Sequence, residues 1–222
     1  MSRLPLIAAI GVGIGLAGYL AAPSFTNTAP AVSFGAVQAQ ESGSVDTTIV
    51  QEMTIGDPEA EVTIIEYASF TCPHCKRFHE QVLPQIKENY VDTGKVRFVY
   101  REVYFDRYGL WAGMVARCGD GQRYFGIVDM IYEDQGTWTR GQDPATIAGN
   151  LRKIGLTAGL PPETVDACMQ DADKAQAMYA LWEENRVADD ITSTPSFVID
   201  GQKYANMSYD EFASILDAAL GE

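Results

Sequence analysis

The sequence predicts an α/β fold: a sheet covered by helices, with a helical block inserted at about residues 106–190. Residues 62–67 are rich in β-branched and aromatic side chains, which is typical of a largely buried strand. Residues 95–103 alternate in polarity and predict a second strand. A helical pattern lies between these segments, and a helix between two strands implies a crossover and parallel pairing. Strand character returns at residues 196–199, after the helical block.

Local signals place the elements around the first of these strands. Residues 47–53 predict a short strand. A helix is expected to begin at Pro73, because the missing N–H of proline needs no partner in a first turn. Pro84 lies inside the helical pattern and predicts a kink. The apolar stripe of this helix is expected to be Phe78, Val82 and Ile86.

Two later helices carry start signals in the sequence. Asp143 followed by Pro144 predicts an N-cap and a first helical residue, and Gly155 is expected to end that helix. Ser208 and Glu211 form a capping box ahead of an amphipathic final helix.

Composition bounds the class of protein. The 222 residues include 16 basic and 30 acidic side chains, for a formal net charge of −14. A surface this acidic argues against nucleic-acid binding, which needs a basic footprint. With 46% hydrophobic residues, the chain has enough apolar side chains to bury a core.

The first 39 residues are interpreted as a signal peptide. Arg3 is their single charged side chain, residues 4–22 are uncharged and mostly apolar, and small residues precede a possible cleavage after Ala39. The alternative is an uncleaved membrane anchor, since nineteen apolar residues can span a bilayer. Under either interpretation, the remainder of the chain is exported. It is expected to consist of a loose linker over residues 40–46 and a folded domain over residues 47–222.

The run Cys72-Pro73-His74-Cys75 is the candidate redox site. Two cysteines at this spacing at a helix start can form a disulfide without movement of the backbone. If Pro73 is the first helical residue, Cys72 is the N-cap and faces the amides of His74 and Cys75. These amides and the helix dipole favour a thiolate at Cys72, whereas Cys75 lies one turn inside and is expected to be buried.

Metal chemistry is the alternative for this motif. Haem attachment requires a histidine directly after the second cysteine, and this chain has Lys76 there. A structural zinc site requires four ligands. The nearby Cys and His candidates are Cys72, Cys75, His74 and His79. A helix start separates neighbouring side chains, so we expect no metal and no cofactor, and we expect His79 on the helix surface.

Residues 62–67, the run from Thr71 to Cys75, the run Thr194-Pro195-Ser196-Phe197 and the final helix together resemble the DsbA family of thioredoxin-fold proteins. The resemblance covers about residues 47–222, and the helical block is similar to the inserted helical domain of that family. It implies a thioredoxin-like fold: a central mixed sheet flanked by helices, with that insertion.

The resemblance also implies roles for individual residues. Cys72 is the attacked sulfur, Cys75 resolves the mixed disulfide, and Glu66 is a buried carboxyl group six residues before the first cysteine. A cis peptide joins Thr194 to Pro195, and this loop lies against the cysteines and pairs with substrate backbone. The chain departs from the best-known members at Thr194, where they carry valine, and this position bears on redox strength and substrate choice.

Cys118 and Cys168 lie on apolar helical faces inside the helical block. We expect a structural disulfide between two helices, because an exported protein meets an oxidising environment. A second redox pair and two free buried thiols are the alternatives.

These observations predict an exported, periplasmic dithiol oxidase that gives its Cys72–Cys75 disulfide to reduced, unfolded exported polypeptides. The chain is expected to be a monomer, and the resemblance implies a membrane redox partner that reoxidises it. The alternatives are a disulfide isomerase or reductase, a copper- or zinc-binding module on the same fold, and a peptide-binding chaperone.

Overall fold

The computed structural model of the chain describes residues 45–119, 121–141 and 143–222. The predicted signal peptide and most of the predicted linker lie outside the described residues. Within the described part of the chain, no helix has the length and apolar character needed to cross a membrane.

The centre of the fold is a five-stranded mixed sheet with the strand order β1-β3-β2-β4-β5. Its strands are β1 (Met53–Ile55), β2 (Val62–Ala68), β3 (Val96–Glu102), β4 (Ser196–Ile199) and β5 (Gln202–Ala205). β2 and β3 pair in parallel, as the intervening helical pattern predicts. β4 pairs antiparallel with β2, which places the beginning of β4 beside the end of β2. The short edge strand β5 was not predicted.

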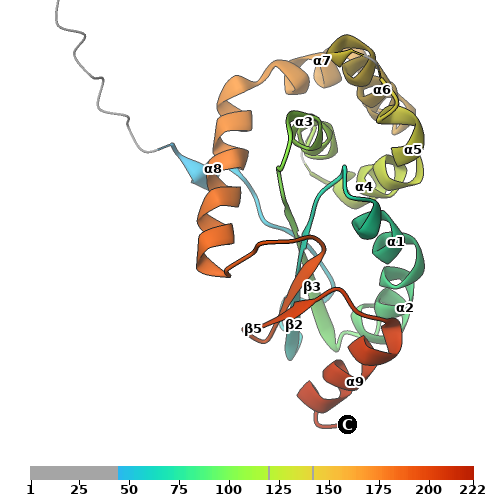
Figure 1. Cartoon of the computed structure of the whole chain (residues 1–222), viewed down its shortest axis with the longest axis vertical. Coiled ribbons are helices and arrows are strands. Elements are labelled where there is room, and N and C mark those ends of the chain that lie inside the picture. The colour runs from blue at the N-terminus through green and yellow to red at the C-terminus, as the bar shows by residue number, and fades with distance from the viewer. Residues whose placement is uncertain (1–44, 120, 142) are drawn as a thin grey trace, which may run out of the picture. The chain divides into compact units, whose positions relative to one another are not determined.

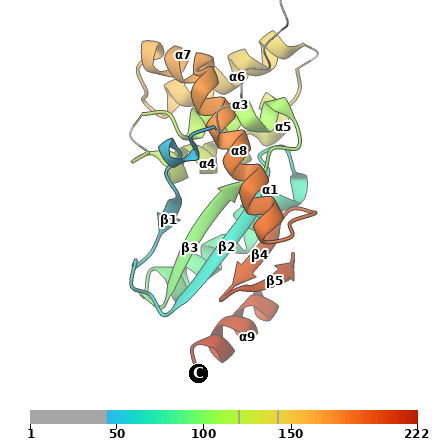
Figure 2. The ribbon, with the colours of Figure 1, turned by 90° about the vertical axis from the view of Figure 1, so that its left-hand side faces the viewer.

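Helices cover both faces of this sheet (Figures 1 and 2). Two lie after β2, α1 (Pro73–Gln81) and α2 (Leu83–Ile86), followed by a π-helical segment, η2 (Lys87–Val91). The insertion between β3 and β4 consists of α3 (Arg107–Ala116), α4 (Tyr124–Glu133), α5 (Gln135–Trp138), α6 (Pro144–Thr157), α7 (Pro162–Gln170) and α8 (Ala172–Ala188). The last helix is α9 (Tyr209–Ala219). The described elements confirm the α/β class and the predicted helical insertion.

The two faces of the sheet bury separate apolar clusters. On one face, the rings of Phe78 in α1 and Phe197 in β4 lie 4.7 Å apart, and Phe212 of α9 packs against both. On the other face, α8 packs Met178 and Trp182 over the sheet, and Figure 2 shows this helix crossing in front of the strands. The sheet is therefore held between two layers of helices.

Local predictions were accurate where the signal was a cap. Asp143 caps α6, and Ser208 with Glu211 forms the capping box of α9. The helix after β2 is interrupted at Val82, directly before the turn that contains Pro84, as predicted.

Two local predictions were wrong. Residues 47–49 form a 3₁₀ helix, η1 (Thr47–Ile49), and not a strand, because the carboxylate of Asp46 accepts a hydrogen bond from the amide of Thr48. Gly155 does not end its helix, which continues to Thr157. It allows close packing instead, because a Cβ at this position would lie 3.0 Å from a methyl group of Val165.

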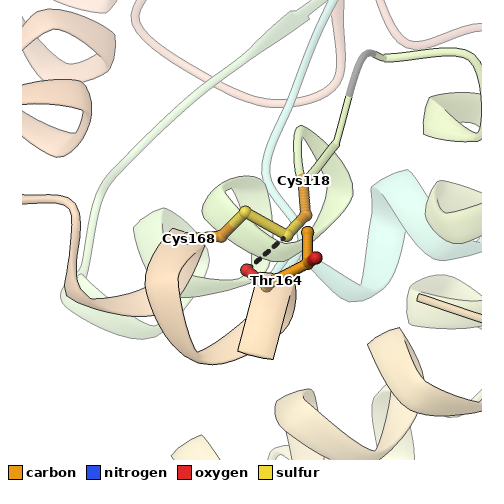
Figure 3. Close-up of a disulfide and its surroundings, with 3 residues drawn as sticks. All are labelled: Cys118, Thr164 and Cys168. Carbon is orange, nitrogen blue, oxygen red and sulfur yellow. Dashed lines mark hydrogen bonds between the residues drawn. A yellow bond between two sulfur atoms is a disulfide. The ribbon is translucent and has the colours of Figure 1, made fainter. Parts of the chain in front are cut away.

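A disulfide joins Cys118, just after α3, to Cys168 in α7 (Figure 3). The two Cα atoms are 5.7 Å apart, and the carbonyl oxygen of Thr164 contacts the Cys118 sulfur at 3.4 Å. This is the pairing expected from the sequence, and both cysteines belong to the insertion. Its role as a purely structural link stays a prediction.

Candidate functional site

The end of β2 delivers the two remaining cysteines to the start of α1. β2 ends at Ala68, a four-residue loop follows, and α1 begins at Pro73. Cys72 is the N-cap and has an extended backbone, as the sequence predicts. Cys72 is half-buried and Cys75 is completely buried, and both are free thiols. Only Cys72 is therefore open to another protein's thiol.

The loop before β4 lies against Cys72. Its peptide bond between Thr194 and Pro195 is cis. The carbonyl oxygen of Thr194 is 3.5 Å from the Cys72 sulfur, although 122 residues separate the two positions. Pairing of β4 with β2 brings them together, because β4 begins two residues after Thr194, next to the end of β2.

The environment of Cys72 favours its thiolate. A hydrogen bond from the Cys75 thiol is the largest of several contributions that lower the pKa of Cys72 to about 5 from the ordinary 9.0. Burial opposes this shift, whereas the side chain of Thr194 and the amides of Cys75 and His74 support it. From the sequence, the helix amides were expected to be the main cause of a lowered Cys72 pKa. They contribute less because the Cys72 side chain makes no direct capping hydrogen bond.

Cys75 has the opposite character. Burial raises the pKa of Cys75 far above its ordinary value, and the hydrogen bond to Cys72 and then the charges of Glu66 and Cys72 add to the rise. At neutral pH the pair therefore holds one proton on the inner sulfur and one negative charge on the outer sulfur. This asymmetry suits a disulfide whose outer sulfur is attacked.

The side chain of His74 lies on the surface beside Arg77. It is exposed, and its Nδ1 lies 2.7 Å from a guanidinium nitrogen of Arg77. Because a guanidinium can only donate, Nδ1 is the acceptor of this hydrogen bond. His74 contributes to the Cys72 site through its backbone amide.

Glu66 lies inside the fold, behind the cysteines. It is completely buried on β2, and neither carboxyl oxygen has a hydrogen-bond partner among the described residues. Burial, with a smaller contribution from the charge of Cys72, raises the pKa of Glu66 well above 4.5. The carboxyl group is therefore placed to hold or release a proton close to the thiols.

Replacement of Glu66 by glutamine is expected to stabilise the reduced protein as pH rises. The folded carboxyl group keeps its proton above pH 4.5, whereas the unfolded one loses it, so the wild type loses roughly 1.4 kcal/mol of stability per pH unit until the folded pKa is passed. Glutamine does not ionise, so the advantage of the variant grows over this window and is absent below it. Urea unfolding at several pH values measures this, with the exposed Glu59→Gln as control. An advantage that does not depend on pH would contradict the buried-acid assignment.

The prediction that His79 is a surface residue was wrong. His79 is buried, its Nε2 lies 2.6 Å from an oxygen of Asp129 on α4, and its ring packs 4.7 Å from that of Tyr132. α4 of the insertion covers this side of α1, which the sequence did not reveal. Within the described residues, no three or more His, Cys, Asp or Glu side chains form a group that could hold a metal ion.

Sequence reasoning also missed polar contacts between the insertion and the cysteine loop. The hydroxyl of Thr71 donates to the carboxylate of Asp106 at 2.6 Å, and Asp106 also caps α3. The side-chain amide of Gln135 reaches the loop from α5. The one available signal was the position of Asp106 before a helical pattern. That position indicates a helix cap and does not indicate a contact with the cysteine loop.

Fold and site together define a thioredoxin-fold protein with a Cys-x-x-Cys pair at a helix start, beside a cis-proline loop. The chain belongs to the thioredoxin family, whose sequence model matches residues 48–218, and it is a DsbA-type member. Alpha-DsbA1 of Wolbachia pipientis has a crystal structure that superposes with a TM-score of 0.72 at 27% identity, covering 78% of this chain and 92% of that one.

Two sequence relatives support the same assignment. One is a Rickettsia bellii protein that is provisionally named a protein-disulfide oxidoreductase. It is 30% identical over 202 residues, which are 87% of this chain and 77% of that protein. A Rickettsia felis protein with the same provisional name is 31% identical over 172 residues. That match spans 77% of this chain and 61% of the Rickettsia felis protein.

Proposed function

We propose that this chain is an exported thiol–disulfide oxidoreductase that acts as a dithiol oxidase on reduced, unfolded polypeptides. The observation that carries the proposal is the asymmetry of the pair: an accessible Cys72 with a pKa of about 5 and a buried Cys75 whose pKa is raised. A sulfur that is stable as a thiolate is a good leaving group, so a disulfide that contains it is readily given away.

The exchange begins with the oxidised pair. A substrate thiolate attacks the Cys72 sulfur, the bond between Cys72 and Cys75 breaks, and the Cys75 sulfur leaves with the electron pair and takes up a proton. Glu66 is the nearby buried acid that is placed to supply this proton. A second substrate thiolate then attacks the substrate sulfur of the mixed disulfide, and Cys72 leaves as a thiolate. In the reverse direction, Cys75 resolves the mixed disulfide.

The remaining parts of the proposal concern the setting of the reaction. The apolar segment at the start of the chain supports export to the periplasm, where an oxidising environment maintains disulfides. Each turnover leaves the pair reduced, so an oxidant must return it to the disulfide, and we propose a membrane-bound redox partner for this step. The cis-proline loop beside Cys72 supports substrate binding by Thr194 and Pro195 through the backbone, and we propose that the protein acts as a monomer.

The test mixes the oxidised protein with a reduced, unfolded polypeptide that contains two cysteines. We expect a disulfide in the polypeptide and a dithiol in the protein, counted by mass spectrometry after alkylation. Equilibration with glutathione then gives the redox potential. A potential as low as that of cytosolic reductants, about −270 mV, would replace the oxidase assignment by a reductase one. An absence of any exchange would remove the proposed function.

A further inference from the structure

The junction between α4 and α5 lies against the loop that carries Cys72. The side-chain amide nitrogen of Gln135, the first residue of α5, is 2.7 Å from the carbonyl oxygen of Phe70 and 3.1 Å from that of Cys72. Gln135 is only 7% exposed. Because both partners are carbonyl oxygens, which only accept, the NH₂ group of Gln135 must face them.

Two further contacts hold the same junction in place. The hydroxyl of Tyr132 donates to the carbonyl of Ser69 at 3.2 Å. The ammonium group of Lys76 donates to the carbonyls of Tyr132 and Glu133 at 2.7 and 2.9 Å. Tyr132 of the insertion thus contacts the cysteine loop, and Lys76 of α1 contacts the insertion. These contacts fix the position of Gln135.

The two carbonyl groups that Gln135 binds have different consequences. Phe70 is completely buried, so its carbonyl cannot turn to water, and Gln135 supplies its hydrogen bond. The carbonyl of Cys72 accepts from the amide of Lys76 at 3.2 Å, the first hydrogen bond of α1. Gln135 therefore fixes the peptide unit that determines how Cys72 sits over the helix start.

We propose that Gln135 is a positioning residue for the redox reaction, which holds Cys72 over the amides of α1 and withdraws negative charge from the Cys72 carbonyl. The proposal rests on the proposed function, since it concerns the same sulfur. A carbonyl oxygen close to a thiolate repels it, and a hydrogen bond to that oxygen weakens the repulsion. Loss of the donor therefore makes the thiolate less favourable and the disulfide harder to give away.

The purely structural alternative is that Gln135 only fastens α5 to the loop. The two roles are separated by replacing Gln135 with leucine, which keeps the approximate size and removes the donor. The matched control is Asn150→Leu, because the Asn150 side-chain amide donates to the Trp138 carbonyl at 3.4 Å within the insertion. Both variants lose an amide-to-carbonyl hydrogen bond of the helical insertion, but only one of these bonds reaches the loop.

Three readouts are compared among the wild type, Gln135→Leu and Asn150→Leu. We expect Gln135→Leu to shift the thiolate absorbance titration of Cys72 to higher pH. Its equilibrium constant with glutathione should move about tenfold toward the disulfide form, equivalent to about 30 mV toward a weaker oxidant. Asn150→Leu should lose stability in urea and match the wild type in the other two readouts. A Gln135→Leu protein that loses only stability would overturn the proposal.

Gln135→Glu provides a second test if the leucine variant does not fold. A carboxyl group at this buried position faces two carbonyl oxygens and can donate to them while it is protonated. Once it ionises it repels the Cys72 thiolate, so the titration should move further than in Gln135→Leu over the pH range in which the new group is charged. A wild-type titration at pH values where infrared spectroscopy shows the new group ionised would overturn the positioning role. Failure of the wild type itself to exchange with glutathione would instead remove the proposed function, so the two failures are distinguishable.

Discussion

Replacement of Cys75 by serine is expected to leave substrate covalently bound to Cys72. The variant keeps the accessible sulfur and the support of Thr194 and the helix amides, and the serine hydroxyl can donate in place of the lost Cys75 thiol. Cys72 therefore still attacks a disulfide in a partner protein. Serine cannot break the resulting mixed disulfide, because a hydroxyl group does not take part in thiol–disulfide exchange. The adduct should rise from a trace in the wild type to most of the protein. It is measured as a species of higher mass on a non-reducing gel that a reductant removes.

Cys72→Ser is the matched control, and we expect it to form no adduct. The remaining Cys75 is completely buried and its pKa is raised, so it is neither accessible nor ionised at neutral pH. The rate of exchange should fall at least about a hundredfold, to the uncatalysed background. The double variant Cys72→Ser/Cys75→Ser leaves only the disulfide between Cys118 and Cys168. Adducts in that protein would mean that the second disulfide also takes part in exchange.

The part of the site that these variants test was predictable because its signals are local. The spacing of Cys72 and Cys75, with Pro73 between them, indicates a helix start and a redox pair without knowledge of the rest of the chain. Caps such as Asp143 act on their own first turn, so they too can be found from the sequence. The crossover between β2 and β3 follows from the order of the elements.

The part that could not be predicted depends on how the insertion packs. His79 is buried because α4 covers it. Gln135 reaches the cysteine loop because α5 begins beside that loop. The sequence does not reveal how either helix packs. Gly155 signals a helix end by local rules, yet packing against Val165 keeps it inside α6. For Cys72, the hydrogen bond from the Cys75 thiol in the same turn outweighs the helix amides. The direction of the pKa shift was therefore predictable from the sequence, whereas its main cause was not predicted.

Replacement of Arg117 by methionine is expected to destabilise the protein by about 3–5 kcal/mol, the usual cost of leaving a buried charge without its partner. Two guanidinium nitrogens of Arg117 each lie 2.6 Å from a carboxylate oxygen of Glu102. The two side chains are only 7% and 4% exposed. Burial disfavours the charge on Arg117, but the charge and hydrogen bonds of Glu102, together with smaller contributions from Tyr124 and Tyr104, outweigh burial and raise the pKa of Arg117. The hydroxyl of Tyr124 also donates to Glu102, at 2.7 Å.

The surface pair between Arg152 and Asp166 is the matched control, because it has the same chemistry at 37% and 44% exposure. Arg152→Met should lower the free energy of unfolding far less than Arg117→Met does, since water screens an exposed pair. Arg117→Met/Glu102→Leu removes both buried charges and should recover part of the loss, because no unpaired charge remains. Urea unfolding of the four proteins at neutral pH, with the disulfide next to Arg117 intact in each, gives the free energies of unfolding. Equal losses of unfolding free energy in Arg117→Met and Arg152→Met would contradict this prediction. Such a result would mean that the carboxylate of Glu102 becomes hydrated in Arg117→Met. The end of β3 would then be held less rigidly against α3 than the ion pair indicates.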